Sequence, residues 1–344
     1  MTTPFIDYIK ILARGRQGSR SLTVTEAQNA MTLILNGDIA PEQMGAFWML
    51  IRVREETIDE ATGFTQATRH YLRTQQVSEL QADLDWPAYA GKRNELPWFL
   101  LAALALAQTG IKVAMHGHEF VEDERIYLDQ VMRALNLPIA DSINAAKQQL
   151  AQNNFTYLPL TLFAPKLAEL MNLKRLLGLR SPVNTVVRLM NPTNAKHSVH
   201  GVFHKGYDTL HIGAAQQLKD PSVLVFCGGN GEAEVNPERQ ITLGLYKNNS
   251  TQTATYWQDW PQATKQHLRQ KSNLDVKRLQ QHWSGEIVDP FGELAILNTL
   301  ACILAMQADT ADLSNHQSHY QQALTLWQQR DKTQWFMQSM DKAV

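Results

Sequence analysis

The alternation of apolar strands and helices after about residue 85 constrains the fold of this chain more than any other feature. Short apolar segments predict strands at 111–114, 155–158, 199–203, 223–227, 241–246 and 253–257. Helical patterns of roughly ten to fifteen residues separate several of them, which is typical of a largely parallel sheet covered by helices on both faces. Ligands usually bind at the strand ends of such a sheet. Two loops at predicted strand ends, 115–119 and 228–234, are therefore candidate ligand-binding loops.

The first 75 residues carry helical patterns only. Capping boxes at Thr23 and Thr57, each with a glutamate three residues later, predict two helix starts. An apolar stripe predicts a helix face that a domain of this size cannot bury alone: Met44, Phe47, Trp48 and Ile51. We therefore predict an all-helical dimerisation domain at 1–75, a larger α/β domain at 76–344 with a central, mostly parallel sheet, and a homodimer formed through the N-terminal helices.

Charge and cysteine content argue against several classes of protein. The formal net charge is −1 over 344 residues, so nothing global calls for nucleic acid or an anionic membrane as partner. The two cysteines, Cys227 and Cys302, form no disulfide framework and fit a reducing cytosol. The longest apolar run, 96–107, is shorter than the roughly 20 residues that span a bilayer. The N-terminus lacks the apolar segment of a signal peptide. We expect a cytoplasmic protein without a membrane partner.

Several segments resemble, in the same order, the landmarks of the anthranilate phosphoribosyltransferases. They are LTVTEAQNAMTLILNGDIAPEQMGAFWMLIRVREETIDEATGF, KVAMHGHE, LKRLLGLRSPVN, LMNPTNA, HGVFHKGY and VLVFCGGNGEAEV. The resemblance covers most of the chain. It implies a small helical domain followed by an α/β domain, with a site for a phosphorylated sugar, magnesium and an aromatic acceptor.

The phosphate and magnesium motifs of that family are largely replaced here. The resemblance places the glycine-rich phosphate loop at 88–92, where one glycine remains, and a hydroxyl-rich segment at 98–101, which reads Trp-Phe-Leu-Leu. The family's Lys-His-Gly-Asn-Arg becomes 115–119, and its Asp-Glu magnesium pair becomes Ala233 and Glu234. A single glutamate is a poor magnesium site. What remains is a vestigial phosphoribosyl pyrophosphate site: Tyr89, Gly91, Lys92, His116, Gly117 and Glu234.

The acceptor site is altered as well. Lys174 stands where the family has an arginine that binds anthranilate, and Ala164 replaces a histidine. Lysine keeps the charge but cannot make a two-pronged contact with a carboxylate. Lys174 and Asn191 form a vestigial acceptor site. The joint losses imply no anthranilate phosphoribosyltransferase activity, no catalytic residues, no metal and no cofactor.

The motif Tyr89-x-Gly91-Lys92-Arg93 is similar to that of a divergent branch of the family, linked to sequence-independent nucleic-acid binding. Phosphate contacts need positive charge but no exact geometry. The candidate nucleic-acid-binding residues are Lys10, Arg14, Arg16, Arg20, Lys92 and Arg93. Tyr89 and Trp98 could stack bases, although Trp98 lies in an apolar helix. The alternative for the N-terminal basic residues, and for a second basic run at 265–278, is a solvated surface.

Three functions therefore stay open. The first is a non-catalytic, dimeric protein that binds DNA or RNA without sequence preference. The second is a glycosyl or phosphoribosyl transferase with an altered substrate, whose surviving polar groups would be Glu234, His116, Asn191 and Lys174. Magnesium is expected as a cofactor only for this second function. The third is a regulatory binder of a small anionic metabolite. Zinc binding by His116 and His118, and a nucleophilic Cys227, have little support because no further ligand or base accompanies them.

Overall fold

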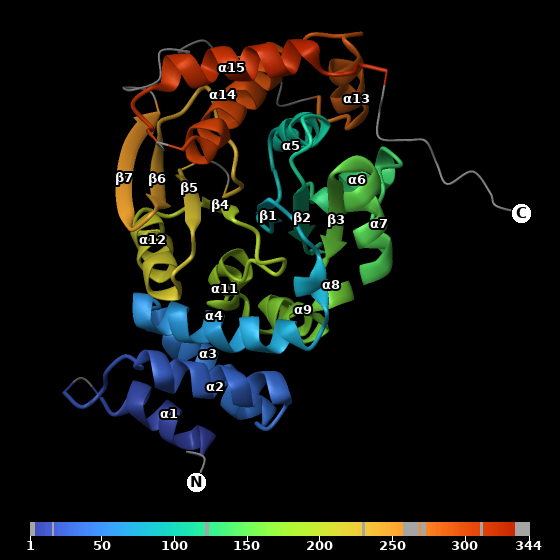
Figure 1. The fold of residues 1–344 in the computed structure, drawn as a ribbon. Helices are drawn as coiled ribbons and strands as arrows, with labels where there is room; N and C mark the ends of the chain where they lie inside the picture. The colour runs from blue at the N-terminus through green and yellow to red at the C-terminus, as the bar shows by residue number, and fades with distance from the viewer. Residues whose placement is uncertain are drawn as a thin grey trace, which may run out of the picture.

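The computed structural model describes residues 4–15, 17–120, 124–228, 231–256, 268–269, 273–309 and 312–333 (Figure 1). The N-terminal part consists of four helices: α1 (Phe5–Ala13), α2 (Val24–Asn36), α3 (Pro41–Arg54) and α4 (Ile58–Arg73). Both predicted capping boxes are confirmed. The Thr23 hydroxyl accepts the backbone N–H of Glu26, and Thr57 accepts that of Glu60. These two bonds fix where α2 and α4 begin.

The apolar stripe on α3 is covered within the chain. Phe47 and Trp48 are fully buried, and their rings pack against those of Phe5 and Phe64, with centroids 5.2 and 5.5 Å apart for Phe5–Phe47 and Trp48–Phe64. The helical domain therefore buries most of this stripe itself, contrary to the prediction. The homodimer remains a prediction without that support.

One seven-stranded sheet forms the centre of the larger part. Its strands are β1 (Leu84–Ala88), β2 (Val113–Gly117), β3 (Phe155–Pro159), β4 (His197–Val202), β5 (Ser222–Cys227), β6 (Ile241–Lys247) and β7 (Ser250–Tyr256). Their order across the sheet is β3-β2-β1-β4-β5-β6-β7. The first five are parallel, and β6 and β7 run antiparallel to their neighbours. The predicted fold class is confirmed: a helical N-terminal part and a larger α/β part with a mostly parallel sheet.

The sequence prediction missed β1, which lies in the middle of the sheet. Its segment, Leu-Asp-Trp-Pro-Ala, contains a proline that cannot donate to a ladder, and such a residue argues against a central strand. All five residues are nevertheless buried. The other six strands were found, with ends shifted by up to three residues. Ile111 and Phe203 lie outside β2 and β4, and Trp257 lies outside the described residues.

The helices of the larger part are α5 (Phe99–Gln108), α6 (Leu128–Ala134), α7 (Ile143–Asn153), α8 (Leu160–Phe163), α9 (Pro165–Asn172), α10 (Lys174–Leu177), α11 (Val183–Leu189), α12 (Tyr207–Leu218), α13 (Lys277–Ser284), α14 (Pro290–Gln307) and α15 (His316–Gln329). Helix α6 begins at Leu128, just after Ile126, which pairs with Lys92 in an isolated antiparallel bridge.

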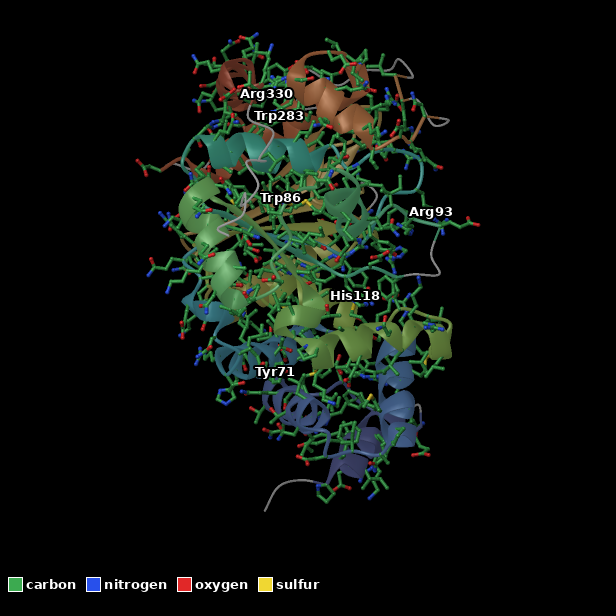
Figure 2. All side chains as sticks on the ribbon, turned by 90° about the vertical axis from the view of Figure 1, so that its right-hand side faces the viewer. Tyr71, Trp86, Arg93, His118, Trp283 and Arg330 are labelled. Atoms are coloured by element: carbon green, nitrogen blue, oxygen red, sulfur yellow. The ribbon has the colours of Figure 1, made fainter. Side chains whose placement is uncertain are left out.

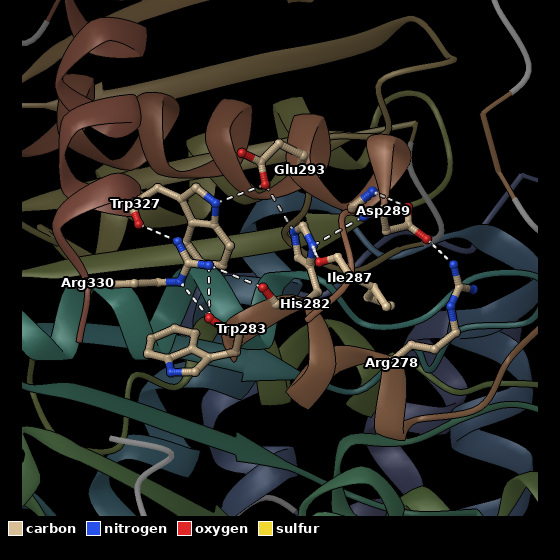
Figure 3. A network of polar contacts seen from close by, with 9 residues as sticks. Arg278, His282, Trp283, Ile287, Asp289, Glu293, Trp327 and Arg330 are labelled. Atoms are coloured by element: carbon tan, nitrogen blue, oxygen red, sulfur yellow. Dashed lines mark hydrogen bonds and ion pairs between the residues drawn. The ribbon is translucent and has the colours of Figure 1, made fainter. Parts of the chain in front are cut away.

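Helix α14 is long and apolar enough to cross a membrane, but 72% of it is buried inside the protein. It is a core helix. Arg330, at the end of α15, holds α13 and α15 together beside it (Figure 3). Its guanidinium lies 3.5 Å from the ring centroid of Trp327 and donates to the carbonyl oxygen of Trp283 at 2.9 Å. The Trp327 indole N–H donates to Glu293 on α14 at 2.9 Å, which completes the connection.

Arg69 fixes the N-terminal helices against the sheet-containing part. From α4 it forms a two-pronged ion pair with Asp220, with N–O distances of 2.6 and 2.9 Å, and also donates to the carbonyl oxygen of Leu189. Planar, two-pronged pairs of this kind set orientation as well as distance. Figure 1 shows α4 lying along this boundary, with α1 to α3 beyond it. The space between the two parts therefore has a defined shape.

Candidate functional site

The strand order creates a switch point between β1 and β4. From β1 the chain continues outward to β2 and β3, and it then crosses to β4 and continues the other way to β5. Only Leu84–His197 and Asp85–Ser198 pair between β1 and β4, so the two strands part beyond Asp85. Open α/β sheets bind ligands at such a point, outside the carboxyl ends of the strands.

A cleft of about 420 Å³ lies at these strand ends, between α3 and the α/β part. We call it the arginine cleft, because its lining includes Arg52, Arg93, Arg125, Arg180, Arg188 and Arg239. Among the described residues of the lining, Glu56 is the one acidic side chain. Figure 2 shows Arg93 projecting outward from the body of the molecule at about the height of Trp86. The cleft therefore gathers positive charge that the near-zero net charge of the chain conceals.

Arg188 is a buried cation that forms no ion pair with a described carboxylate. It is 7% exposed, and its guanidinium donates to the carbonyl oxygen of Asn184 at 2.5 Å. Among the described residues no carboxylate lies within 4.0 Å of it. Burial lowers the pKa of Arg188 to about 10, with Glu232 opposing that change. Burying an unpaired charge is costly, so a side chain of this kind in a cleft indicates a site for an anion.

Four other arginines of the cleft likewise have no carboxylate partner among the described residues: Arg52, Arg93, Arg180 and Arg239. Arg125 donates to the carbonyl oxygens of Ala90 and Gly91, both at 3.0 Å, and so supports the loop that follows β1. Guanidinium groups present a planar fork of donors that matches phosphate and carboxylate oxygens. The cleft is therefore a donor-rich surface suited to phosphate groups.

The loop at 88–92 already holds an anion that belongs to the chain itself. The backbone N–H groups of Ala90 and Gly91 donate to Glu232 Oε1 at 2.8 and 2.7 Å. Gly91 has φ of +68°, which turns its amide toward the carboxylate. Burial raises the pKa of Glu232, and the charge of Arg188 and the two amides oppose that rise. A carboxylate thus satisfies the amides that would otherwise be free to bind phosphate.

Lys92 and Glu234 close the neighbouring site in the same way. Lys92 Nζ lies 2.5 Å from Glu234 Oε1, and the N–H of Phe99 at the start of α5 donates to Oε2 at 2.7 Å. Burial raises the pKa of Glu234 to about 7, while the Lys92 charge opposes the rise. Both side chains are buried. The contact predicted between Lys92 and a nucleic-acid backbone is therefore wrong, because its ammonium is enclosed by the protein.

This donor set does not fit magnesium. Both oxygens of Glu234 are already engaged, and Ala233 and Leu100 offer no oxygen. Within the described part of the chain, no group of three or more histidine, cysteine, aspartate or glutamate side chains could hold a metal ion.

A chain of buried hydrogen bonds crosses the sheet beneath the cleft. Its first arm runs from the Tyr89 hydroxyl to His116 Nδ1 at 2.7 Å, and from His116 Nε2 to Asp85 Oδ1 at 2.9 Å. Tyr89 is fully buried, so it cannot stack a base as proposed from the sequence, and the same holds for Trp98 at 2% exposed. His116 therefore connects Tyr89 and Asp85 inside the sheet.

The second arm reaches Asp85 from the cleft. The Ser198 hydroxyl donates to Asp85 Oδ2 at 2.6 Å, and His200 Nε2 lies 2.9 Å from Ser198 Oγ. His211, which lines the cleft, places Nδ1 3.1 Å from His200 Nδ1. A carboxylate only accepts hydrogen bonds, so the Ser198 hydroxyl donates its proton to Asp85 and must accept from His200 Nε2–H. His200 Nδ1 then carries no proton and accepts from His211 Nδ1–H. Burial lowers the pKa of His211 to about 3, which keeps it neutral.

The remaining predicted residues lie elsewhere. Lys174 packs its ammonium over the Phe120 ring, 5.0 Å from the centroid. Asn191 exchanges two 2.9 Å hydrogen bonds with the backbone of Ala195. Neither lines the arginine cleft. Gly117 passes close to the Ala88 carbonyl oxygen, where a Cβ would lie 2.6 Å away.

The N-terminal basic residues do not join the cleft. Lys10 pairs with Asp7 at 2.9 Å, and Arg20 pairs with both oxygens of Glu26 at 2.7 Å. Arg14 is exposed at the end of α1, and Arg16 lies outside the described residues. Of the predicted nucleic-acid contacts only Arg93 lines the cleft.

Sequence reasoning missed most of the residues that form the cleft. Arg180 and Arg188 fall in or next to a segment that indicated only the fold. Residues 174–188 nevertheless contain four basic side chains and no acidic one, which was a usable signal. Glu232 lies in a predicted ligand-binding loop, but its contact with the loop at 88–92 was not predicted.

Comparison with known proteins agrees with this architecture. A model of the glycosyl transferase family, a/b domain, matches residues 99–321, and a model of its helical bundle domain matches residues 6–71. The chain belongs to the glycosyl transferase family. An anthranilate phosphoribosyltransferase from Geobacillus sp. (strain WCH70) is 29% identical over 236 residues, which cover 67% of this chain and 68% of that protein.

Solved anthranilate phosphoribosyltransferases share the fold. The anthranilate phosphoribosyltransferase of Thermus thermophilus superimposes with a TM-score of 0.70 at 18% identity, over 94% of this chain and 97% of that one. The Saccharomyces cerevisiae enzyme, solved in complex with PRPP and Mg, gives 0.69 at 17% identity, over 94% and 96%. At these identities the likeness concerns the fold alone.

Proposed function

We propose that this phosphoribosyltransferase-fold protein binds the phosphate groups of nucleic acid in the arginine cleft, without sequence preference and without catalysing a reaction. The observation that carries the proposal is Arg188, a buried guanidinium with no carboxylate partner among the described residues. A phosphodiester supplies the missing negative charge and accepts a two-pronged contact. Arginine contacts to phosphates position a strand but read no bases.

The neighbouring site supports a binding function over phosphoribosyl transfer. Transfer from a pyrophosphate needs donors and a metal that stabilise charge on the departing group. Here the amides of the loop at 88–92 already donate to Glu232, and Glu234 already accepts from Lys92. Breaking either contact would leave a buried charge without its partner, which is unfavourable.

A transferase with an altered substrate is the second candidate. The names of the relatives favour it, since they are anthranilate phosphoribosyltransferases. In that case the arginine cleft would bind an anionic substrate. The two candidates differ in one measurable respect, because a transferase releases inorganic pyrophosphate from phosphoribosyl pyrophosphate and a binding protein does not.

A titration by fluorescence anisotropy tests the proposal. The probes are labelled single-stranded and double-stranded DNA of random sequence. They are about 20 nucleotides long, so that they span a typical single-strand site, and are titrated at several salt concentrations. We expect binding whose logarithmic affinity falls with the logarithm of salt, by roughly 0.7 to 0.9 per phosphate neutralised. Arg20→Met is the matched control for the cleft variant Arg188→Met, because it removes a surface arginine outside the cleft. Absence of binding at micromolar protein, together with pyrophosphate release, would establish the second candidate instead.

We further propose that the chain acts as a homodimer in the cytoplasm, where each subunit contributes one arginine cleft. A nucleic acid long enough to reach both clefts would then bind more tightly than a short one, because the second contact is intramolecular. Sedimentation at micromolar concentration tests the dimer directly, and a monomer there would exclude it.

A further inference from the structure

One aromatic side chain in the arginine cleft is exposed. Phe203 follows β4 and is 56% exposed, whereas the described tryptophan side chains are all buried. Among the large hydrophobic side chains that are exposed in the described residues, Phe203 is the only aromatic one; the others are Ile6, Val53, Leu176, Leu179 and Val288. It also lines the arginine cleft. An exposed ring beside unpaired arginines is a combination that folding alone does not require.

The backbone on both sides of Phe203 is fixed. A Cβ at Gly201 would lie 2.1 Å from the backbone carbon of Glu232, so the end of β4 and the backbone at Glu232 are in direct contact. The Gly228 N–H donates to the Val202 carbonyl oxygen at 3.2 Å, and the Cys227 thiol donates to that of His204 at 3.5 Å. The ring is therefore presented from a rigid position, which reduces the entropy lost when a ligand packs on it.

The ring and the guanidinium groups are complementary to the two parts of a nucleotide. Arg188 and Arg180 line the same cleft and suit the phosphate, while a flat apolar ring suits the face of a base. Proteins that bind single strands without sequence preference combine a basic groove with aromatic side chains on which bases stack. In a duplex the faces of each base are already covered by the neighbouring base pairs. The Phe203 ring therefore cannot stack on a base there.

We infer that Phe203 stacks an unpaired base, so that the arginine cleft selects single-stranded over double-stranded nucleic acid. This inference rests on the proposed function, because the phosphates must occupy the cleft for a base to reach the ring. A ribose or deoxyribose strand would serve equally, since stacking involves the base alone. The ligand class is thus an unstructured single strand with at least one accessible base.

Two substitutions and one altered probe test the inference in the full-length protein. Phe203→Leu keeps an apolar side chain but removes the ring, and Phe203→Trp keeps a ring. The probes are a single strand, its duplex, and an abasic single strand of equal length, which offers phosphates without bases. We expect Phe203→Leu to weaken binding of the single strand about tenfold or more, in line with the loss of one stacked base. Phe203→Trp should retain it.

The same experiment separates this inference from the proposed function. Wild-type protein should bind the abasic strand as weakly as Phe203→Leu binds the intact one, and the substitution should leave duplex and abasic affinities within about twofold. Equal wild-type affinity for intact and abasic strands would overturn the stacking while leaving phosphate binding in place. Absence of wild-type binding to every probe would overturn both. A change of sedimentation in Phe203→Leu would show that the ring contacts a second copy, which also overturns the inference.

Discussion

Glu232 Oε1 accepts a 2.7 Å hydrogen bond from the backbone N–H of Gly91, across 141 residues of sequence. The same oxygen accepts the N–H of Ala90 at 2.8 Å. Two converging amides on a glycine turn are a typical anion site, and here the anion is an internal carboxylate. The site is therefore intact in its backbone and closed by one side chain.

Removing that side chain should open the site. We expect Glu232→Ala to bind pyrophosphate more tightly than the wild-type protein does, because the two amides and the nearby Arg188 would face an unoccupied space. Isothermal titration with pyrophosphate measures this. The matched control is Glu232→Gln, whose side-chain oxygen can still accept both amides and should leave the site closed. Pyrophosphate binding of equal strength in wild type would contradict the prediction.

Arg188 should affect ligand binding and stability in opposite directions. Arg188→Met keeps the length of the side chain and removes a buried charge that has no carboxylate within 4.0 Å among the described residues. Replacing buried charge by apolar packing is often neutral or stabilising, so the midpoint of urea unfolding should stay or rise. Nucleic-acid affinity should fall by roughly 10- to 100-fold, the value of one charge-assisted contact. A parallel loss of stability and binding would indicate a purely structural role.

Lys92 and Glu234 should be strongly coupled in stability. Both are buried, and each is the other's charge partner at 2.5 Å. Lys92→Met alone would leave a buried carboxylate and should cost about 3–5 kcal/mol of the free energy of unfolding. The double variant Lys92→Met, Glu234→Gln should recover most of that loss, since no charge remains. A double-mutant cycle in urea measures the coupling, and simple additivity of the two single changes would contradict it.

The sequence predicted the architecture well because strand and helix patterns are local. Six of the seven strands follow from apolar runs, and the capping boxes at Thr23 and Thr57 follow from residues three apart. β1 was missed because Pro87 is atypical of a central strand, although its neighbours bury it on both sides.

The arginine cleft could not be predicted in the same way. Arg52, Arg93 and Arg188 come from separate elements that only the strand order and the packing of α3 bring together. Burial is equally non-local: Lys92 and Arg93 are adjacent in sequence, yet Lys92 is enclosed with Glu234 and Arg93 is exposed in the cleft. A basic pair in a sequence therefore does not say which of its members faces a ligand.

The neutral state of His211 should make the protein sensitive to acid. Burial lowers the pKa of His211 to about 3 in the folded protein, from an ordinary value of 6.5, and Arg188 adds to the effect. Between pH 6.5 and about 3 the unfolded chain binds a proton at this residue and the folded chain does not. Its contribution to stability is thus present above pH 6.5 and is lost as the pH falls, by about 1.4 kcal/mol per pH unit within that range.

Comparing His211→Gln with wild type isolates this contribution. Glu234 acts in the opposite sense, because burial raises its folded pKa to about 7, so the folded protein gains stability as the pH falls from 7 toward 4.5. That effect is common to both proteins and cancels in the difference.

The glutamine amide can donate to His200 Nδ1 in place of the His211 N–H, so the hydrogen-bond chain to Asp85 is kept. We expect the free energies of unfolding to run parallel above about pH 7 and to converge, or cross in favour of His211→Gln, as the pH falls from about 6.5 to about 4.5. Urea unfolding at half-unit pH steps measures this, and parallel curves throughout that range would show that His211 is already protonated in the folded protein.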